Sequence, residues 1–262
     1  MIGTIPRRIY QRAQPKSATH SRRGEETMDF SLTSTRRHDG TVILLLVAGL
    51  VTSYHFLLRP WHRTWSATDE EISRLLPGDD LVPEPSEKTT RAITVETASE
   101  DVWPWIVQLG QGRGGFYSYT WLENLAGADI HNVNRIVPEL QELEEGDSIR
   151  MVHEEYWLQS PVTAMTVKRI EPGRTLVLQG YDGGTWTFHL DPTSEETTRF
   201  IVRGQKPKTR TVLGYVLRYL AYELPHFIME RGLMRGIKAR AEHFDRDESI
   251  HSDRPTGTDG SA

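Results

Sequence analysis

The segment TAMTVKRIEPGRTLVLQGYDGGTWTFHLDPTSEETTRFIVR, residues 163–203, decides the fold class. Runs rich in β-branched and aromatic residues alternate within it with the turn signals Glu171-Pro172-Gly173 and Asp191-Pro192. Connections this short force neighbouring strands to pair antiparallel, because a parallel return needs a crossover of roughly a dozen residues. The segment therefore predicts an antiparallel meander. Its strands are expected at 163–170, 175–180, 184–190 and 197–203.

Helices and two further strands are expected on either side of this meander. Alternating apolar and polar residues predict strands at 91–97 and 147–152. Apolar residues at helical spacing predict a first helix after Ser99, a short second helix at 119–125 and a long one at about 209–244. These elements give an α+β helix-grip fold, in which a curved antiparallel sheet wraps around the long C-terminal helix. A cavity for a ligand is expected between the sheet and that helix.

Charge is unevenly distributed along the chain. Up to Trp65 there are ten Lys and Arg against four Asp and Glu, whereas the remainder carries 21 basic and 32 acidic residues. The acidity of the domain argues against a nucleic acid as its partner, because phosphate recognition needs the opposite charge. The chain contains no cysteine, which removes disulfides, thiolate metal ligands and cysteine nucleophiles.

Residues 41–58, TVILLLVAGLVTSYHFLL, contain no Asp, Glu, Lys or Arg. A helix of this length spans ~27 Å, close to the roughly 30 Å of a bilayer's hydrocarbon core. Tyr54, Trp61 and Trp65 fall where an aromatic belt would lie. A cleaved signal peptide is the main alternative, but Arg-Pro-Trp follows the run where a small-residue cleavage pattern would stand. We therefore expect an uncleaved single-pass anchor. The eight basic residues before it favour an extracytoplasmic soluble domain.

The chain is accordingly expected to divide into five segments. Within the polar third segment, Thr68 and Glu71 have the spacing of a capping box and predict one short helix at 68–76. The five segments are a disordered basic leader at 1–40, a transmembrane helix at 41–60, a linker at 61–88, a helix-grip domain at 89–244 and a disordered tail at 245–262.

Two blocks of sequence resemble a known family. They are VWPWIVQLGQGRGGFYSYTWLENLAGADIHNVNRI (102–136) and ELPHFIMERGLMRGIKARAE (223–242), with the strands between them. Together they are similar to the START-like, polyketide cyclase-related (SRPBCC) superfamily, in a membrane-anchored branch with a Gly-Arg-Gly-Gly-Phe-Tyr-Ser block. The resemblance covers about residues 88–244. It implies the helix-grip fold and a cavity for a lipid, sterol, polyketide or hormone-like molecule, and it implies no particular reaction.

The loop and short helix from Gln108 to Asn124 form the candidate ligand-binding region. The glycines of the loop allow close backbone approach, but no Lys-Ser/Thr follows them, and the loop leaves a helix where a phosphate-binding loop leaves a strand. The region is either a tight corner that packs aromatic residues inward or a rim of the pocket, with Arg113 placed to meet an anionic or carbonyl head group. The residues expected to bind a ligand are Gln108, Arg113, Tyr117, Tyr119, Trp121, Asn124 and Trp186.

Candidate catalytic residues are few. His131 is the one histidine of this block and the best general acid or base, with Glu123 as a second candidate. For Glu123, a structural ion pair with Arg113 or Arg135 is favoured over a catalytic role. The histidines show no metal-ligand spacing, so neither a metal nor a cofactor is expected. In the last helix, Glu230 and Arg231 either face the mouth of the pocket or belong to a solvated face.

Two functions follow from these features, and a third is weaker. The first is membrane-tethered binding or transfer of an apolar or lipid-like small molecule, since an anchor would place the pocket beside a reservoir of such ligands. Its partners are that molecule and the membrane. The alternative is a cyclase- or dehydratase-type enzyme acting on a hydrophobic substrate in the same cavity. The third is a scaffold whose domain binds another protein.

Overall fold

The computed structural model describes residues 33–125, 127, 129–153, 163–208, 211, 214, 219 and 222–252. The chain forms two compact units, Met1–Leu50 and Val51–Ala262. The described part of the first unit, residues 33–50, belongs to helix α1 (Thr33–Ser53), whereas the π-helical turn η1 (Tyr54–Leu58) and helix α2 (Arg59–Arg63) belong to the second unit. The predicted disordered leader lies outside the described residues up to position 32, and from Thr33 onward the chain is helical.

One helical stretch among the described residues is long and apolar enough to cross a membrane. It covers Gly40–Arg63, reaches a mean hydropathy of 2.1 and buries none of its apolar window within the protein. An apolar helix that stays exposed differs from the core helix of a soluble domain, whose apolar side chains are covered. The predicted anchor at 41–60 coincides with this stretch.

A six-stranded antiparallel sheet forms the centre of the second unit, in the order β1-β6-β5-β4-β3-β2. The meander predicted from 163–203 is confirmed, and every neighbouring pair is antiparallel. Strand β4 coincides with the predicted 175–180, and the others begin or end within a few residues of prediction. The strands are β1 (Glu87–Val95), β2 (Ser148–Arg150), β3 (Ala164–Glu171), β4 (Thr175–Gly180), β5 (Thr185–Ser194) and β6 (Thr197–Lys206).

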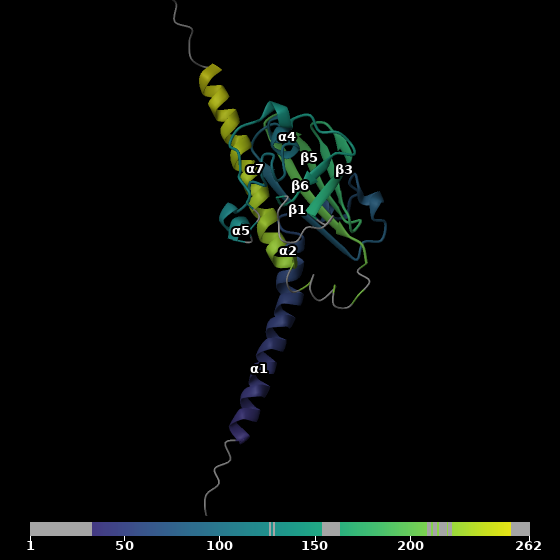
Figure 1. Ribbon diagram of the computed structural model, residues 1–262, viewed down its shortest axis with the longest axis vertical. Helices are drawn as coiled ribbons and strands as arrows, with labels where there is room; N and C mark the ends of the chain where they lie inside the picture. Colours follow the sequence, from purple (N-terminus) through teal and green to yellow (C-terminus); the bar gives the residue numbers. More distant parts are fainter. Residues whose placement is uncertain are drawn as a thin grey trace, which may run out of the picture. The chain divides into compact units, whose positions relative to one another are not determined.

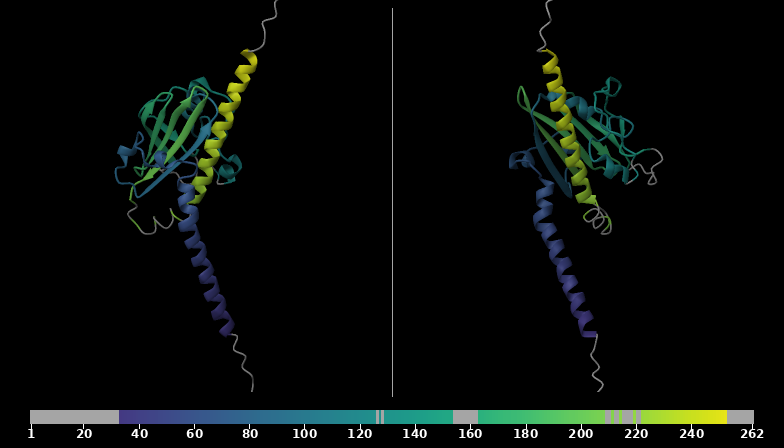
Figure 2. Two further views of the ribbon diagram at one scale, coloured as in Figure 1. Left: turned by 180° about the vertical axis from the view of Figure 1, so that it is seen from behind. Right: turned by 90° about the vertical axis from the view of Figure 1, so that its left-hand side faces the viewer.

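The long C-terminal helix α7 (Glu223–Ser252) runs diagonally across one face of this sheet, as Figures 1 and 2 show in three orientations. Helix α4 (Ser99–Val107) packs beside it, against both α7 and β5. The core between sheet and helices is built from buried apolar side chains, among them Phe188, Leu190, Phe200, Val202, Leu233, Met234 and Ile237. This α+β architecture is the helix-grip fold expected from the sequence. The predicted start of the last helix, 209–222, lies largely outside the described residues, as do 253–262 of the predicted tail.

Residues 61–88, expected to be a linker, are part of the folded unit. Helix α3 (Asp69–Ser73) begins at the predicted capping box, in which Thr68 Oγ1 accepts from Glu71 N and Glu71 Oε2 accepts from Thr68 N. The turn η2 (Asp79–Leu81) follows. Arg203 on β6 is buried beneath this segment and donates to Asp79 Oδ2 at 2.6 Å and to the carbonyl oxygen of Glu71 at 2.5 Å. A buried guanidinium thus fastens the segment to the sheet.

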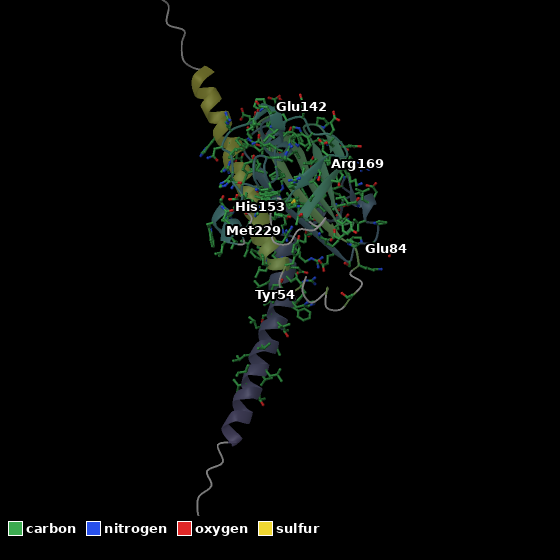
Figure 3. The ribbon with its side chains drawn as sticks, in the orientation of Figure 1. Tyr54, Glu84, Glu142, His153, Arg169 and Met229 are labelled. Carbon is green, nitrogen blue, oxygen red and sulfur yellow. The ribbon has the colours of Figure 1, made fainter. Side chains whose placement is uncertain are left out.

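The glycine-rich block packs directly on α7. A Cβ at Gly236 would collide with the carbonyl oxygen of Tyr117, and one at Gly232 would lie 2.8 Å from Ser118 Oγ. Ser118 Oγ also donates to the carbonyl oxygen of Met229 at 2.9 Å, and Met229 is labelled in Figure 3. The glycines of α7 therefore set how closely this block approaches the helix.

Candidate functional site

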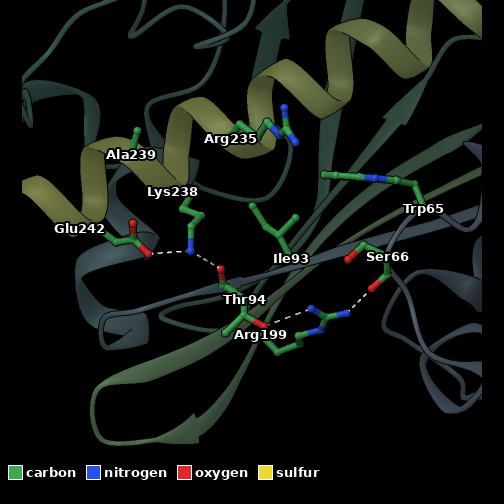
Figure 4. Close-up of a pocket in the computed structure, with 9 residues that line it drawn as sticks. All are labelled: Trp65, Ser66, Ile93, Thr94, Arg199, Arg235, Lys238, Ala239 and Glu242. Atoms are coloured by element: carbon green, nitrogen blue, oxygen red, sulfur yellow. Dashed lines mark hydrogen bonds and ion pairs between the residues drawn. The ribbon is translucent and has the colours of Figure 1, made fainter.

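A groove of about 480 Å³ runs between α7 and the outer strand β1, closed on one side by the chain that follows α2. Its lining residues come from four separate parts of the sequence, namely the chain after α2, β1, β6 and α7 (Figure 4). Sites for small ligands usually fall between about 300 and 1,000 Å³. The lining residues are Trp65, Ser66, Ile93, Thr94, Arg199, Arg235, Lys238, Ala239 and Glu242.

Two of the three cations in the groove are already paired. Lys238 Nζ lies 2.7 Å from Glu242 Oε1 and donates to the carbonyl oxygen of Thr94. Arg199 forms an ion pair of 2.6 Å with Glu71. The indole of Trp65 and the side chains of Ile93 and Ala239 supply apolar surface between these polar groups. The groove therefore combines an apolar wall with a positively charged rim.

The remaining cation, Arg235, belongs to a cluster around Trp65. The guanidinium carbon of Arg235 lies 5.7 Å from the centroid of the indole, and that of Arg231, one helical turn earlier, lies 5.1 Å from it. Both distances are within the range of a cation–π interaction. Among the described residues, neither guanidinium has a hydrogen bond or an ion pair, and Arg231 Nε is buried without an acceptor.

A second polar cluster lies inside the sheet–helix interface. Glu230 on α7 is 2 % exposed, and its two oxygens accept from Arg91 Nη1 at 2.6 Å and from Trp186 Nε1 at 2.8 Å. Arg91 Nε donates to the carbonyl oxygen of His62 at 2.7 Å. Glu230 is consequently no member of a solvated helix face, which was one of its two expected roles. It is a buried carboxylate whose partners come from β1 and β5.

His226 lies one turn before Glu230, with its Nε2 4.0 Å from Glu230 Oε2. Its ring stands beside those of Trp186 and Tyr222. Burial lowers the pKa of His226 to about 4, against a smaller opposing effect of the Glu230 carboxylate. The imidazole is therefore neutral at physiological pH.

The predicted ligand-binding residues Gln108 and Tyr117 lie together in the interior and are hydrogen-bonded to each other. Gln108 is fully buried and donates from Nε2 to Tyr117 Oη at 2.6 Å, while its Oε1 accepts from the backbone of Val137. Burial raises the pKa of Tyr117 to about 12. The guanidinium of Arg240 on α7 covers the Tyr117 ring at 4.7 Å. These contacts hold the glycine-rich block in place.

Three other predicted ligand-binding residues also make contacts within the protein itself. Arg113 Nη2 donates to the carbonyl oxygens of Val107 and Leu140, so its head group is directed at backbone. Asn124 bonds both the N–H and the carbonyl of Ile130, and the ring of Tyr119 lies against Gly232 of α7. In these contacts they behave as parts of a packed corner, the first of the two expectations for this region.

Trp121 and Trp186, also predicted to bind a ligand, have opposite surroundings. Trp121, on helix α5 (Thr120–Leu125), is 69 % exposed. Trp186 is buried against Phe188 and bonded to Glu230. The structure therefore brings Trp186 into the Arg91–Glu230 cluster and leaves Trp121 at the surface.

The candidate catalytic residues receive little support from their positions. The side chain of His131 is 81 % exposed, and its Nε2 lies 3.2 Å from Oδ1 of Asp129, which is also exposed. A general acid or base needs a partner atom of the substrate within hydrogen-bond reach, and His131 lines neither the groove beside Trp65 nor the smaller pocket beside His55 and Tyr219. The side chain of Glu123 lies outside the described residues. No group of three His, Cys, Asp or Glu that could hold a metal occurs in the described part of the chain.

Sequence analysis missed the grouping of Trp65 with Arg231 and Arg235. The sequence predicts Trp65 in an aromatic belt and Arg231 either at the mouth of the pocket or on a solvated face, and it predicts no role for Arg235. The i,i+4 spacing of two arginines without an acidic residue between them on that face was the available signal.

Comparison with known proteins supports no assignment from sequence. No family model matches the chain. No curated protein matches it either.

Several solved structures are similar to this domain at low sequence identity. A conserved protein of unknown function from Enterococcus faecalis is 11 % identical, with a TM-score of 0.35, and the match covers 63 % of this chain and 85 % of that one. A polyketide cyclase-like protein from Corynebacterium glutamicum is 16 % identical, with a TM-score of 0.28 and coverages of 65 % and 96 %. An AHSA1-like protein from Aeromonas hydrophila is 13 % identical, with a TM-score of 0.33 and coverages of 60 % and 94 %.

Overlap at this level carries no argument about activity. The fold assignment stands on the elements themselves: a curved six-stranded antiparallel sheet, in the order found here, gripping a long C-terminal helix. The architecture is the helix-grip fold, as the resemblance in the sequence implied.

Proposed function

We propose that this chain is a single-pass membrane protein whose helix-grip domain binds an apolar or lipid-like small molecule. The observation that carries the proposal is the groove between α7 and β1, whose indole wall, Trp65, stands two residues after the end of the candidate membrane helix at Arg63.

Contacts within the second unit keep the end of the apolar helix beside the groove. Arg59 donates through Nε and Nη2 to both oxygens of Glu223, at 2.8 and 2.7 Å. The rings of Trp61 and Trp65 lie 5.4 and 6.3 Å from that of Phe227 on α7. Bidentate pairs and aromatic contacts of this kind fix orientation as well as distance. The groove is therefore held close to residues that would emerge from the membrane.

The proposed site differs from the one expected inside the sheet. There, the described interior is filled by the apolar core and by the Arg91–Glu230 cluster. The groove lies on the flank of α7, where Trp65, Ile93 and Ala239 supply apolar surface that is open to an incoming ligand.

Native mass spectrometry of the full chain extracted in mild detergent tests the proposal. We expect an apolar molecule to leave with the wild-type protein and a fluorescent fatty-acid probe to bind to it. In Ala239→Leu, a larger side chain fills the groove from an exposed position on α7, and we expect probe binding at least about tenfold weaker. Ala239→Ser keeps the volume and should bind as the wild type does. Equal binding by all three proteins would remove the groove as the site.

The proposed membrane topology places the domain on the extracytoplasmic side. Its support is the excess of basic residues before the apolar run. Because the chain has no cysteine, a single Glu195→Cys variant can be labelled at one known place, in the exposed β5–β6 turn. We expect a membrane-impermeant maleimide to label this variant in intact cells. Labelling only after permeabilisation would reverse the topology.

A further inference from the structure

The two arginines beside Trp65 form an uncompensated positive charge on α7. Arg231 and Arg235 are four residues apart, so both project from one face of the helix, and like charges at this spacing repel each other. Both nevertheless lie over the same indole, with guanidinium carbons 5.1 and 5.7 Å from its centroid. The uncharged indole lies near both guanidinium groups but neutralises the charge of neither.

The nearest carboxylates of α7 are committed elsewhere. Both oxygens of Glu230 are occupied by Arg91 and Trp186 in the interior. Glu242 Oε1 accepts from Lys238 Nζ and from the backbone N–H of Glu96. The third acidic residue near the groove, Glu71, is paired with Arg199. No described carboxylate forms an ion pair with Arg231 or Arg235, and the buried Nε of Arg231 has no acceptor in that same part of the chain.

We propose that Arg231 and Arg235 bind the anionic head group of an amphiphile whose apolar chain lies in the groove along Ile93 and Ala239. The inference rests on the function proposed above and names the chemistry of its ligand. A carboxylate or phosphate accepts two parallel hydrogen bonds from a guanidinium, and the Trp65 ring lies within cation–π distance of both guanidinium groups. Binding such an anion relieves the repulsion between the two arginines.

The test measures binding of matched probes to the full chain in detergent. The probes are a fluorescent long-chain fatty acid, its methyl ester and an alkyl phosphate of the same chain length. We expect the acid or the phosphate to bind about tenfold more tightly than the neutral ester, as one charge-assisted contact supplies. The stronger of the two anions assigns the head group to the carboxylate or the phosphate class.

Charge-removing variants locate the head group. Arg235 is exposed, so Arg235→Gln should fold normally, and we expect it to bind the anionic probe and the ester equally well. Arg231→Gln should act in the same direction. Arg174→Gln removes an exposed guanidinium from the β3–β4 turn and should leave the preference for the anion intact. Thermal unfolding of each variant confirms that the fold is retained.

The outcomes separate the two proposals. If the wild type binds acid, phosphate and ester equally, or if Arg235→Gln keeps the full preference for the anion, the head-group assignment is overturned while lipid binding stands. If none of the probes binds to the wild type, both proposals fall.

Discussion

Glu230 and Arg91 form a salt bridge of 2.6 Å whose side chains are 1 % and 2 % exposed. It joins the long helix to the outer strand of the sheet, at the side where the chain enters from α2. A buried pair of this kind contributes little over an apolar pair of the same volume, but loss of one partner leaves an unpaired charge in the interior. The pair therefore makes the docking of α7 sensitive to single substitutions.

Glu230→Ala should lower the free energy of unfolding by about 3–5 kcal/mol, because Arg91 and Trp186 Nε1 both lose their acceptor. The measurement is denaturant unfolding of the detergent-solubilised full chain, followed by tryptophan fluorescence. Glu195→Ala, at an exposed turn, is the matched control and should change stability by less than about 0.5 kcal/mol. If the double variant Arg91→Met/Glu230→Leu is no more stable than Glu230→Ala, an unpaired charge is the wrong explanation.

Stability should decrease as pH falls from about 6.5 towards 4, in part through His226. The folded state holds the pKa of this histidine at about 4, below its ordinary value of 6.5. Between these values the unfolded chain binds more protons than the folded one, so acidification favours unfolding. Unfolding midpoints at a series of pH values give the wild-type slope.

His226→Gln should weaken the dependence of stability on pH between pH 6.5 and 4. Burial also lowers the pKa of His189. His189 therefore contributes the same pH dependence of stability to the wild type and to His226→Gln. The informative quantity is the difference between the two pH profiles. Parallel profiles from pH 6.5 to 4 would show that His226 takes no part in the dependence.

Gln108→Leu should destabilise the domain by about 2–3 kcal/mol and leave the affinity for a fatty-acid probe unchanged. The side chain is fully buried, and its removal leaves the backbone N–H of Val137 without its acceptor. Unfolding and probe titration on the same preparation separate the two effects. A normal stability with weakened probe binding would return Gln108 to the ligand-binding role expected from the sequence.

Gly236→Ala should cost about 2–3 kcal/mol of stability, because the new methyl group meets the carbonyl oxygen of Tyr117 and the helix must shift. Gly49→Ala provides the control, since a Cβ at that helical position meets nothing within 4 Å. The two unfolding midpoints are compared in one detergent. Equal midpoints would mean that the glycine-rich block can move away from α7 without loss.

The sheet could be predicted from the sequence because its signals are local. The short apolar run Leu176-Val177-Leu178 and the turn Glu171-Pro172-Gly173 determine β4 and its neighbour without any knowledge of distant residues. The capping box at Thr68 was predictable for the same reason. Elements whose pattern is complete within about ten residues are those that the sequence identified correctly.

The site could not be predicted in the same way, because its contacts are remote in sequence. Arg91 looked like a polar position of a strand, and its partner Glu230 follows 139 residues later. Trp65 resembled an interfacial aromatic residue by position, and nothing local indicates that Arg231 and Arg235 cover its ring. The glycine-rich block, by contrast, was distinctive as sequence because Gly110, Gly112 and Gly115 take positive φ, and a Cβ at Gly114 or Gly115 would collide with neighbouring atoms of the same region.

The burial of His62 has a practical consequence for dividing the chain. His62 is 1 % exposed, its carbonyl oxygen accepts from Arg91, and its ring lies 5.4 Å from that of Phe227. A truncation starting at Ser66 would remove the buried His62 and expose the interior of the domain to solvent, even though every strand would be retained. Such a fragment would be prone to aggregation for reasons unrelated to its ligand. The natural place to cut is before Val51, where the second compact unit begins.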